Sequence, residues 1–120
     1  MSTRGKGKRG EDLAVEYLRN VGFEIVERNY KGRRGEIDII ARNKEGLRFV
    51  EVRLRKSDTL VPPAETIIKR KKRRIISAAR EFLYENHLYD REDCHFDVVT
   101  IDEGDDYQID FIPDAFDGTI

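Results

Sequence analysis

Two stretches of the chain carry apolar residues at the three- and four-residue spacing of an amphipathic helix. The first runs from Gly10 to Asn20, and Gly22 just beyond it is a typical helix stop. The second runs roughly from Ala64 to Asn86, and its apolar stripe contains Ala64, Ile67, Ile68, Ile75, Ala78, Ala79, Phe82 and Leu83. The pattern therefore predicts two helices, each with one face to bury.

Shorter runs rich in β-branched and aromatic residues are typical of strands. They cover residues 23–30, 36–42, 47–55, 95–101 and 107–112, the last followed by Pro-Asp-Ala-Phe. Residues 31–35 and 43–46 contain glycine and predict turns, and residues 56–63, with two prolines, predict a loop. The order helix, three strands, helix, two strands predicts one α/β domain with a mixed β-sheet flanked by helices.

Charged residues interrupt the second and third of these strands. In the third strand, Glu51 and Arg53 alternate with apolar side chains, so they share the opposite face. In the second strand, alternation places Asp38 on the face opposite to that of Ile37, Ile39 and Ala41. If the two strands pair through the turn at residues 43–46, Asp38 comes close to Glu51 and Arg53.

Asp38 and Glu51 have the chemistry of a metal site. Mg²⁺ and Mn²⁺ take oxygen ligands, commonly one or two carboxylates together with water and phosphate oxygens. Glu11 is a third acid near this face, in the first turn of the predicted first helix, where the helix dipole favours a carboxylate. Such a site could activate water against a phosphodiester, with Arg53 contacting the scissile phosphate or bridging the acids.

Each of these residues also has a structural interpretation. Glu51 and Arg53 would form a solvent-facing ion pair on a half-exposed strand, which contributes little to stability. Glu11 would be an ordinary acid at a helix start, and Asp38 would cap a turn. The metal-site hypothesis depends on the combination, which is an acid within one strand followed by Glu-x-Arg in the next.

The net charge of the 120-residue chain is only −1, but the charges are unevenly distributed. Residues 1–9 carry four basic residues and no acid, and they predict a flexible basic arm before a single domain at residues 10–120. The end of the chain, from Asp90 onward, is acidic. The second predicted helix is basic, which indicates a phosphate-binding surface, a localisation-like patch or only a solvated face. Its basic residues are Lys69, Arg70, Lys72, Arg73 and Arg74.

Lys71 differs from its basic neighbours because it lies on the apolar stripe of the predicted second helix. It would either pack its stem on the core and keep its ammonium group in water, or reach the carboxylates of Asp38 and Glu51. In the second case it would assist the attacking water or the leaving group. That interpretation requires Lys71 to lie within hydrogen-bonding range of one carboxylate.

The cysteine, the histidines and the length of the apolar runs indicate which classes of protein the sequence does not favour. Cys94 is the only cysteine, which favours a reducing cytoplasm, and no apolar run is long enough for a membrane helix. His87 and His95 lack the spacing of a zinc site. Asp97 interrupts an apolar strand and predicts a structural partner for a basic residue.

Several segments between Gly10 and Phe116 occur in a specific order. They are GEDLAVEYLRNVGFEIVERNY, GEIDIIAR, FVEVRLR, the Lys-rich helix ending in AAREFL, FDVV and PDAF. In this combination the chain resembles the YraN family of small bacterial predicted endonucleases, which is similar to archaeal Holliday junction resolvases and to the PD-(D/E)XK nuclease superfamily. The resemblance implies a restriction-endonuclease-like core of order αβββαβ, Mg²⁺ or Mn²⁺ as cofactor, and nucleic acid, DNA above all, as partner.

The resemblance also implies roles for individual residues. Asp38 matches the motif aspartate and Glu51 matches the second acid. Glu11 matches the helix-1 glutamate that junction resolvases use as an additional metal-site acid, so the implied metal ligands are Glu11, Asp38 and Glu51. Arg53 stands where the superfamily has lysine, and arginine keeps the charge but does not deprotonate near neutral pH. Lys71 is then the candidate for a catalytic lysine supplied by the helix.

Together these patterns predict a cytoplasmic, metal-dependent nuclease or nuclease-like protein acting on branched DNA. A junction-cutting enzyme would favour a two-fold homodimer, because two symmetric strands must be cut. One alternative is a non-catalytic nucleic-acid-binding module on the same fold, in which Glu51 and Arg53 form a structural ion pair. Another is a protein–protein adaptor that uses the acidic C-terminal part.

Overall fold

The fold is a mixed sheet with two helices, as the sequence predicts. The computed structural model describes residues 3–56, 68–103 and 108–118. Its elements, in chain order, are α1 (Thr3–Asn20), β1 (Glu24–Lys31), β2 (Glu36–Asn43), β3 (Gly46–Lys56), α2 (Lys69–Glu85), β4 (Cys94–Glu103) and β5 (Gln108–Phe116). The predicted α/β class and the predicted order of elements are confirmed.

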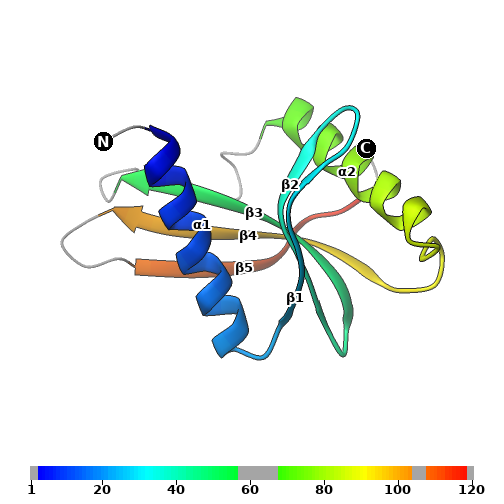
Figure 1. Cartoon of the computed structure of the whole chain (residues 1–120), viewed down its shortest axis with the longest axis horizontal. Coiled ribbons are helices and arrows are strands. Elements are labelled where there is room, and N and C mark those ends of the chain that lie inside the picture. Colours follow the sequence, from blue (N-terminus) through cyan, green and yellow to red (C-terminus); the bar gives the residue numbers. More distant parts are fainter. Residues whose placement is uncertain (1–2, 57–67, 104–107, 119–120) are drawn as a thin grey trace.

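The five strands lie in the sheet in the order in which they occur along the chain. β1 with β2, β2 with β3, and β4 with β5 pair antiparallel, whereas β3 and β4 pair in parallel. A parallel pair needs a crossover connection, and α2 provides it between β3 and β4. Figure 1 shows α1 crossing the sheet and α2 lying beside the turn that joins β1 to β2.

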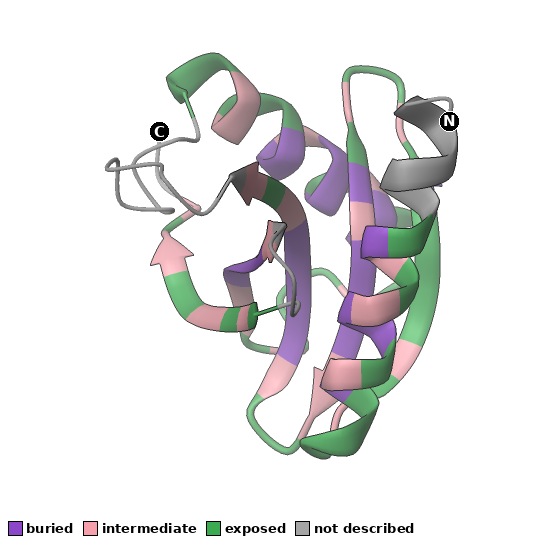
Figure 2. Ribbon diagram, turned by 90° about the vertical axis from the view of Figure 1, so that its left-hand side faces the viewer, coloured by how far each residue is buried: buried purple, intermediate pink, exposed green. Residues whose placement is uncertain are grey.

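Two apolar clusters hold the helices against the sheet. One joins α1 to the sheet through Ala14, Val15, Leu18, Ile39, Ala41, Val50, Val99 and Ile101. The other joins α2 to the sheet and includes Ile37, Ile40, Leu47, Phe49, Ile75, Ala79, Phe82 and Phe96. The successive residues Phe49 and Val50 belong to different clusters, as strand alternation requires. The two helices therefore pack on opposite faces, and Figure 2 shows buried residues on the sheet and on the inward sides of both helices.

The strands β2 and β3 separate part of the way along the sheet. Their pairing runs from Asn43 and Gly46 to Ile39 and Val50, and no later pair is formed. Beyond that point β3 stays paired with β4 as far as Lys56, while β2 stays paired with β1 as far as Glu36. The hairpin of β1 and β2 therefore turns away from the rest of the sheet and reaches α2, as Figure 1 shows.

This separation corrects one detail of the predicted faces. Simple alternation placed Ile37 with Ile39 and Ala41, but Ile37 packs in the α2 cluster with Ile40. The physical reason is that β2 leaves β3 after Ile39, so the turned hairpin presents Ile37 to α2. Asp38, the residue before Ile39 in β2, lies at the point where the two strands separate.

The helix boundaries also differ from the predicted ones. α1 begins at Thr3 rather than at Gly10, so residues 3–9 continue the helix instead of forming a separate arm. The lysines and arginines of this segment have good helix propensity, which partly offsets its glycines, and apolar periodicity alone does not detect such an extension. α2 begins at Lys69, and the predicted start at Ala64 lies outside the described residues, as do residues 57–63 of the predicted loop.

A buried ion pair lies between β3 and β4. Arg48 is 4% exposed and Asp97 is fully buried, and Nη1 of Arg48 lies 3.2 Å from Oδ1 of Asp97. The same oxygen accepts a hydrogen bond from the backbone N–H of Asp114 in β5. Burial raises the pKa of Asp97, against the stabilising effect of these two donors. The structural role predicted for Asp97 is confirmed.

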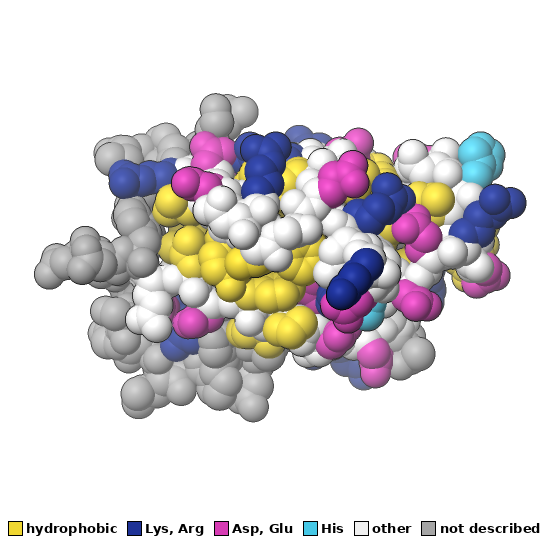
Figure 3. Space-filling model, turned by 90° about the horizontal axis from the view of Figure 1, so that it is seen from below, with side chains coloured by type: hydrophobic (Ala, Val, Ile, Leu, Met, Phe, Trp, Pro, Cys, Tyr) yellow, Lys and Arg dark blue, Asp and Glu magenta, His cyan; other side chains and the backbone are white. Residues whose placement is uncertain are grey.

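Part of the protein surface is apolar. Figure 3 shows hydrophobic side chains gathered across one face, with charged side chains around them. Partly buried Tyr17, Phe23, Ile109 and Phe111 extend the α1 cluster toward the surface, and Val21 is 52% exposed. Neither described helix is long and apolar enough to cross a membrane.

We expect Asp97→Asn to lower the free energy of unfolding by about 2–4 kcal/mol, because the buried guanidinium of Arg48 would lose its buried carboxylate partner. The exposed carboxylates of Glu45 and Asp114, 3.5 and 3.9 Å away, would compensate only in part. Urea denaturation at neutral pH measures the change. The exposed Asp110 on β5 supplies the control, and Asp110→Asn should change stability by less than about 0.5 kcal/mol. Equal effects of the two substitutions would contradict a structural role for the pair.

Candidate active site

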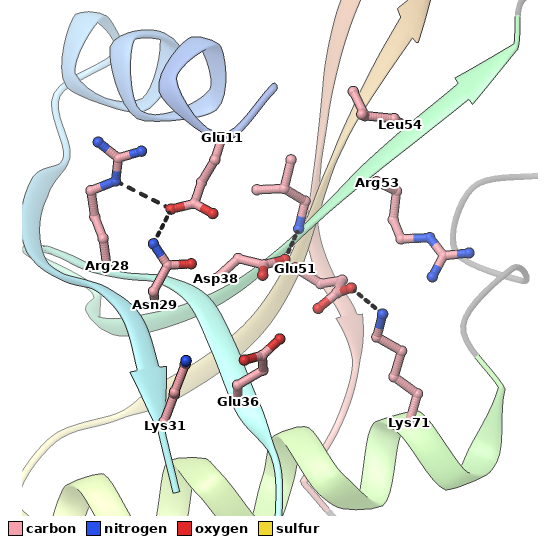
Figure 4. Close-up of a pocket in the computed structure, with 11 residues that line it drawn as sticks. Glu11, Arg28, Asn29, Lys31, Glu36, Asp38, Glu51, Arg53, Leu54 and Lys71 are labelled. Atoms are coloured by element: carbon pink, nitrogen blue, oxygen red, sulfur yellow. Dashed lines mark hydrogen bonds and ion pairs between the residues drawn. The ribbon is translucent and has the colours of Figure 1, made fainter. Parts of the chain in front are cut away.

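The separation of β2 and β3 creates the candidate site. Once the strands part, the backbone N–H of Val52 has no partner on β2, and Oδ2 of Asp38 accepts its hydrogen bond at 2.8 Å. Asp38 thus takes the place of a missing strand bond. Glu51, the residue before Val52, is 5% exposed and lies on the same side as Asp38 (Figure 4). The predicted approach of the two acids is therefore present.

The two carboxylates repel each other in this buried position. Burial is the main cause that raises the pKa of Asp38 to about 7, and the charges of Glu51 and Glu11 raise it further. The N–H of Val52 and the ammonium group of Lys71 act in the opposite direction. Ionised Asp38 is consequently disfavoured without a cation, and a divalent cation between the two acids would relieve that penalty.

Lys71 reaches the two acids from helix α2. Its Nζ lies 2.7 Å from Oε1 of Glu51, although its own side chain is 43% exposed. Lys71 stands near the start of α2, which packs on the face of β3 where Glu51 points. The contact that the catalytic interpretation of Lys71 required is present.

Glu11 occupies the same cleft but is held differently. Its Oε1 accepts hydrogen bonds from Nδ2 of Asn29 at 2.7 Å and from Nε of Arg28 at 3.3 Å. Because α1 begins at Thr3, Glu11 lies in the interior of the helix, and the predicted first-turn position is wrong. Among the described residues, no three acids, histidines or cysteines come close enough together to form a metal site by themselves. Asp38 and Glu51 are thus the primary candidate ligands, and Glu11 is a neighbour.

Arg53 follows Glu51 on the same face of β3 and lines the cleft. Figure 4 shows its guanidinium group directed away from Asp38, on the side where α2 begins. Lys71, rather than Arg53, therefore provides the cation in direct contact with Glu51. The position of Arg53 fits contact with a bound phosphate better than a bridge between the two acids.

The cleft has a volume of about 1010 Å³ and contains residues that sequence reasoning missed. Arg28, Asn29 and Lys31 of β1 and Glu36 of β2 line it. The register of β1 shifts between Ile25 and Glu27, and Asn29 has a positive φ of 52°. These irregularities break the alternation that strand analysis uses, and only the polar run Glu-Arg-Asn at residues 27–29 signals them.

The basic residues predicted for nucleic-acid binding all lie in the first turns of α2, on either side of Lys71. Four of them are exposed: Lys69, Arg70, Arg73 and Arg74. Lys72 is partly buried, and its Nζ lies 5.6 Å from the centre of the Phe116 ring. Lys72 thus packs partly against β5, whereas the other four are open to a ligand.

The chain belongs to a known family. Residues 10–101 match the family described as "Uncharacterised protein family UPF0102". A UPF0102 protein of Dichelobacter nodosus is 45% identical over 101 residues, which cover 84% of this chain and 79% of that protein. One of Hahella chejuensis is 43% identical over 110 residues, covering 92% and 88%, and one of Clostridium perfringens is 40% identical over 110 residues, covering 89% of each.

The raised pKa of Asp38 predicts a pH-dependent gain of stability in Asp38→Asn. In the unfolded chain this carboxyl loses its proton near pH 4, whereas in the folded chain it does so near pH 7. Between these values the unfolded state binds fewer protons, so stability falls as pH rises and the full penalty is present above pH 7. Asparagine carries no charge and still accepts from Val52, so in EDTA at pH 8 the variant should be about 2–4 kcal/mol more stable than wild type.

Urea denaturation at pH 4.5 and at pH 8 measures this difference. The gain should shrink toward zero at the lower pH, because Asp38 is then protonated in the folded wild type. Glu16→Gln removes an exposed carboxylate from α1 and should show no such pH-dependent gain. A variant that is less stable than wild type at pH 8 would show that ionised Asp38 is not under electrostatic strain.

Proposed function

We propose that this member of the UPF0102 family is a cytoplasmic nuclease that hydrolyses phosphodiester bonds of DNA, preferably branched DNA, with Mg²⁺ or Mn²⁺. The observation that carries the proposal is the convergence of Asp38, Glu51 and Lys71 where β2 and β3 separate. The resemblance to the YraN family and to the PD-(D/E)XK nucleases supports it, because that motif places two acids and a lysine in one site. The basic start of α2 supplies cations next to the acids.

The residues present fit a divalent cation. Asp38 and Glu51 offer carboxylate oxygens, the ligand type that Mg²⁺ and Mn²⁺ prefer, and two such ligands suffice when water and phosphate oxygens complete the shell. Burial, and then the charge of Glu51, raise the pKa of Asp38, so a divalent cation beside its carboxylate would be favoured. A bound cation would activate water and neutralise charge on the phosphodiester.

The chain's own groups would position the substrate. In the absence of substrate, Lys71 donates to Glu51, and the same ammonium group is close enough to this carboxylate to hold a water molecule against it or to donate to a phosphate oxygen. Arg53 would bind a non-bridging oxygen of the phosphate, since arginine remains charged and offers several donors. Arg28 and Asn29 would keep Glu11 in a fixed orientation beside the acids.

A non-catalytic nucleic-acid-binding module is the second candidate function. The observation that favours it is the ion pair between Lys71 and Glu51, which neutralises one of the two acids without a metal. Arg53 at the lysine position of the superfamily motif is consistent with this alternative. In such a module DNA binding would be the same with and without a chelator.

A cleavage assay separates the two functions. We expect labelled four-way junctions, flaps, single strands and duplexes to be cut in Mg²⁺ or Mn²⁺, with preference for the branched substrates. Asp38→Ala and Glu51→Gln should lower the rate by at least about a hundredfold, because loss of a metal ligand removes several kcal/mol of transition-state stabilisation. Glu16→Gln is the control with unchanged cleavage. Binding that survives EDTA, with no cutting by wild type, would favour the binding module.

Substitution of Lys71 tests whether it acts on the substrate or only balances the charge of Glu51. We expect Lys71→Met to lower kcat by about 10²-fold, since an aligned donor is lost. The affinity of the Lys71→Met variant for Mn²⁺ should stay the same or rise, because the competing ammonium group has been removed from Glu51. Calorimetric titration with Mn²⁺ and single-turnover cleavage give the two values. A parallel fall of metal affinity and rate would instead assign Lys71 to maintenance of the metal site.

A further inference from the structure

A second groove lies between the turn that joins β1 to β2 and the exposed side of α2. It has a volume of about 500 Å³ and is lined by Arg33, Arg34, Arg70, Arg73, Arg74 and Ser77. Sequence reasoning selected the arginines of α2 but neither Arg33 nor Arg34. These two come from a turn far away along the chain, and only the folding of the hairpin over α2 brings them to the groove.

Close backbone packing holds the turn against α2. A side chain at Gly35 would place its Cβ 2.4 Å from the carbonyl oxygen of Arg74, and one at Gly32 would lie 3.3 Å from Cα of Ala78. The turn is closed by a hydrogen bond from the N–H of Gly32 to the carbonyl of Gly35, at 2.8 Å. The N–H of Arg33 donates to Oε2 of Glu81 at 2.8 Å. The position of the two turn arginines is therefore built into the fold.

The arginines of the groove have little negative charge around them. All five are exposed, and within the described part of the chain only Arg33 has an acidic partner, with Nε 4.0 Å from Oε1 of Glu81. Five like charges along one groove repel one another, and the repulsion is relieved when an anion binds among them. Arginine presents a planar set of donors that matches the oxygens of a phosphate group.

A third hollow connects this groove to the candidate active site. It has a volume of about 540 Å³. It shares Lys31, Glu36 and Lys71 with the active-site cleft and shares with the arginine groove the residues Arg34, Arg70 and Arg74. Lys31 and Lys71 stand on opposite sides of this passage, one from β1 and one from α2 (Figure 4). A mainly cationic surface, with Glu36 as its one acid among the described residues, thus connects the cleft at Glu51 to the groove at Arg33.

We infer that the arginine groove binds internal phosphodiester groups of the nucleic-acid strand whose neighbouring segment lies at Asp38 and Glu51. That the neighbouring segment lies at Asp38 and Glu51 rests on the proposed function, whereas the binding of phosphates in the groove does not. A mainly cationic surface fits the regular negative charge of a nucleic-acid backbone, and phosphate contacts position a strand without reading its sequence. The groove thereby determines the direction in which a strand leaves the cleft.

Substitutions that remove positive charge from the groove test the inference. We expect Arg33→Gln/Arg34→Gln to weaken binding of a fluorescent single-stranded DNA in EDTA at least tenfold at low salt. The slope of log K against log salt should become shallower by about 1.4, because each lost single-strand phosphate contact contributes about 0.7. Arg73→Gln/Arg74→Gln, from the α2 side of the groove, should cause a similar loss. Fluorescence anisotropy at several salt concentrations measures both quantities.

The matched control removes the same amount of charge elsewhere. Arg19→Gln/Arg91→Gln replaces two exposed arginines that do not line the groove, and it should weaken binding less than threefold with an unchanged slope. Groove variants that bind no worse than this control, or that retain the wild-type slope, would overturn the inference. Circular dichroism should show that all variants are folded, since Arg33 is 93% exposed and the turn is held by its backbone.

Oligonucleotides with and without a 5′-terminal phosphate identify the kind of phosphate bound. An equal loss for both in Arg33→Gln/Arg34→Gln supports internal phosphodiesters, whereas a loss confined to the phosphorylated strand overturns that assignment. The binding test is independent of cleavage. If wild type does not cut but the groove variants lose affinity, the proposed nuclease activity fails and the groove stands. If wild type cuts and the groove variants match the control, the groove fails alone.

Discussion

The separation of β2 from β3 after the pair formed by Ile39 and Val50 is the constraint on which the rest of the site depends. A sheet that continued to pair would satisfy the N–H of Val52 with backbone and would leave no cleft. Because the strands part, the carboxylate of Asp38 takes over that bond and is drawn beside Glu51. The departing hairpin then extends over α2 and forms the second wall. One break in strand pairing thus creates the cleft and selects the residues that line it.

The cost of this arrangement is electrostatic. Burial, and then the charge of Glu51, raise the pKa of Asp38. In the neighbouring groove, five arginines of like charge repel one another. Neither concentration of charge favours folding by itself. The framework that tolerates them is the pair of apolar clusters on the two faces of the sheet. Charges held apart in this way, acids in the cleft and cations beside it, complement a metal and a phosphodiester strand.

Helix α2 couples the two regions. Lys71 turns inward to Glu51, whereas Arg70, Arg73 and Arg74, on neighbouring positions of the same turns, face the groove. The inward face of the helix is anchored by Ile75, Ala79 and Phe82 in the core. A substrate held along the groove would therefore be positioned relative to the candidate ligands by a rigid element rather than by a loop.

The sequence by itself determined the class of fold, the order of the elements and the acids that meet. Hydrophobic periodicity is a local property. It placed Asp38 and Glu51 on strand faces opposite the apolar ones, and Lys71 stood out because it interrupted the apolar stripe of its helix. Only the tertiary structure decided where β2 leaves β3, that Arg28 and Asn29 hold Glu11, and that Arg33 and Arg34 join the arginines of α2. These contacts depend on a register shift in β1 and on close backbone packing at Gly32 and Gly35. The first arises in the pairing of β1 with β2 and the second in the packing of the turn on α2, and the local pattern of one segment carries no information on either.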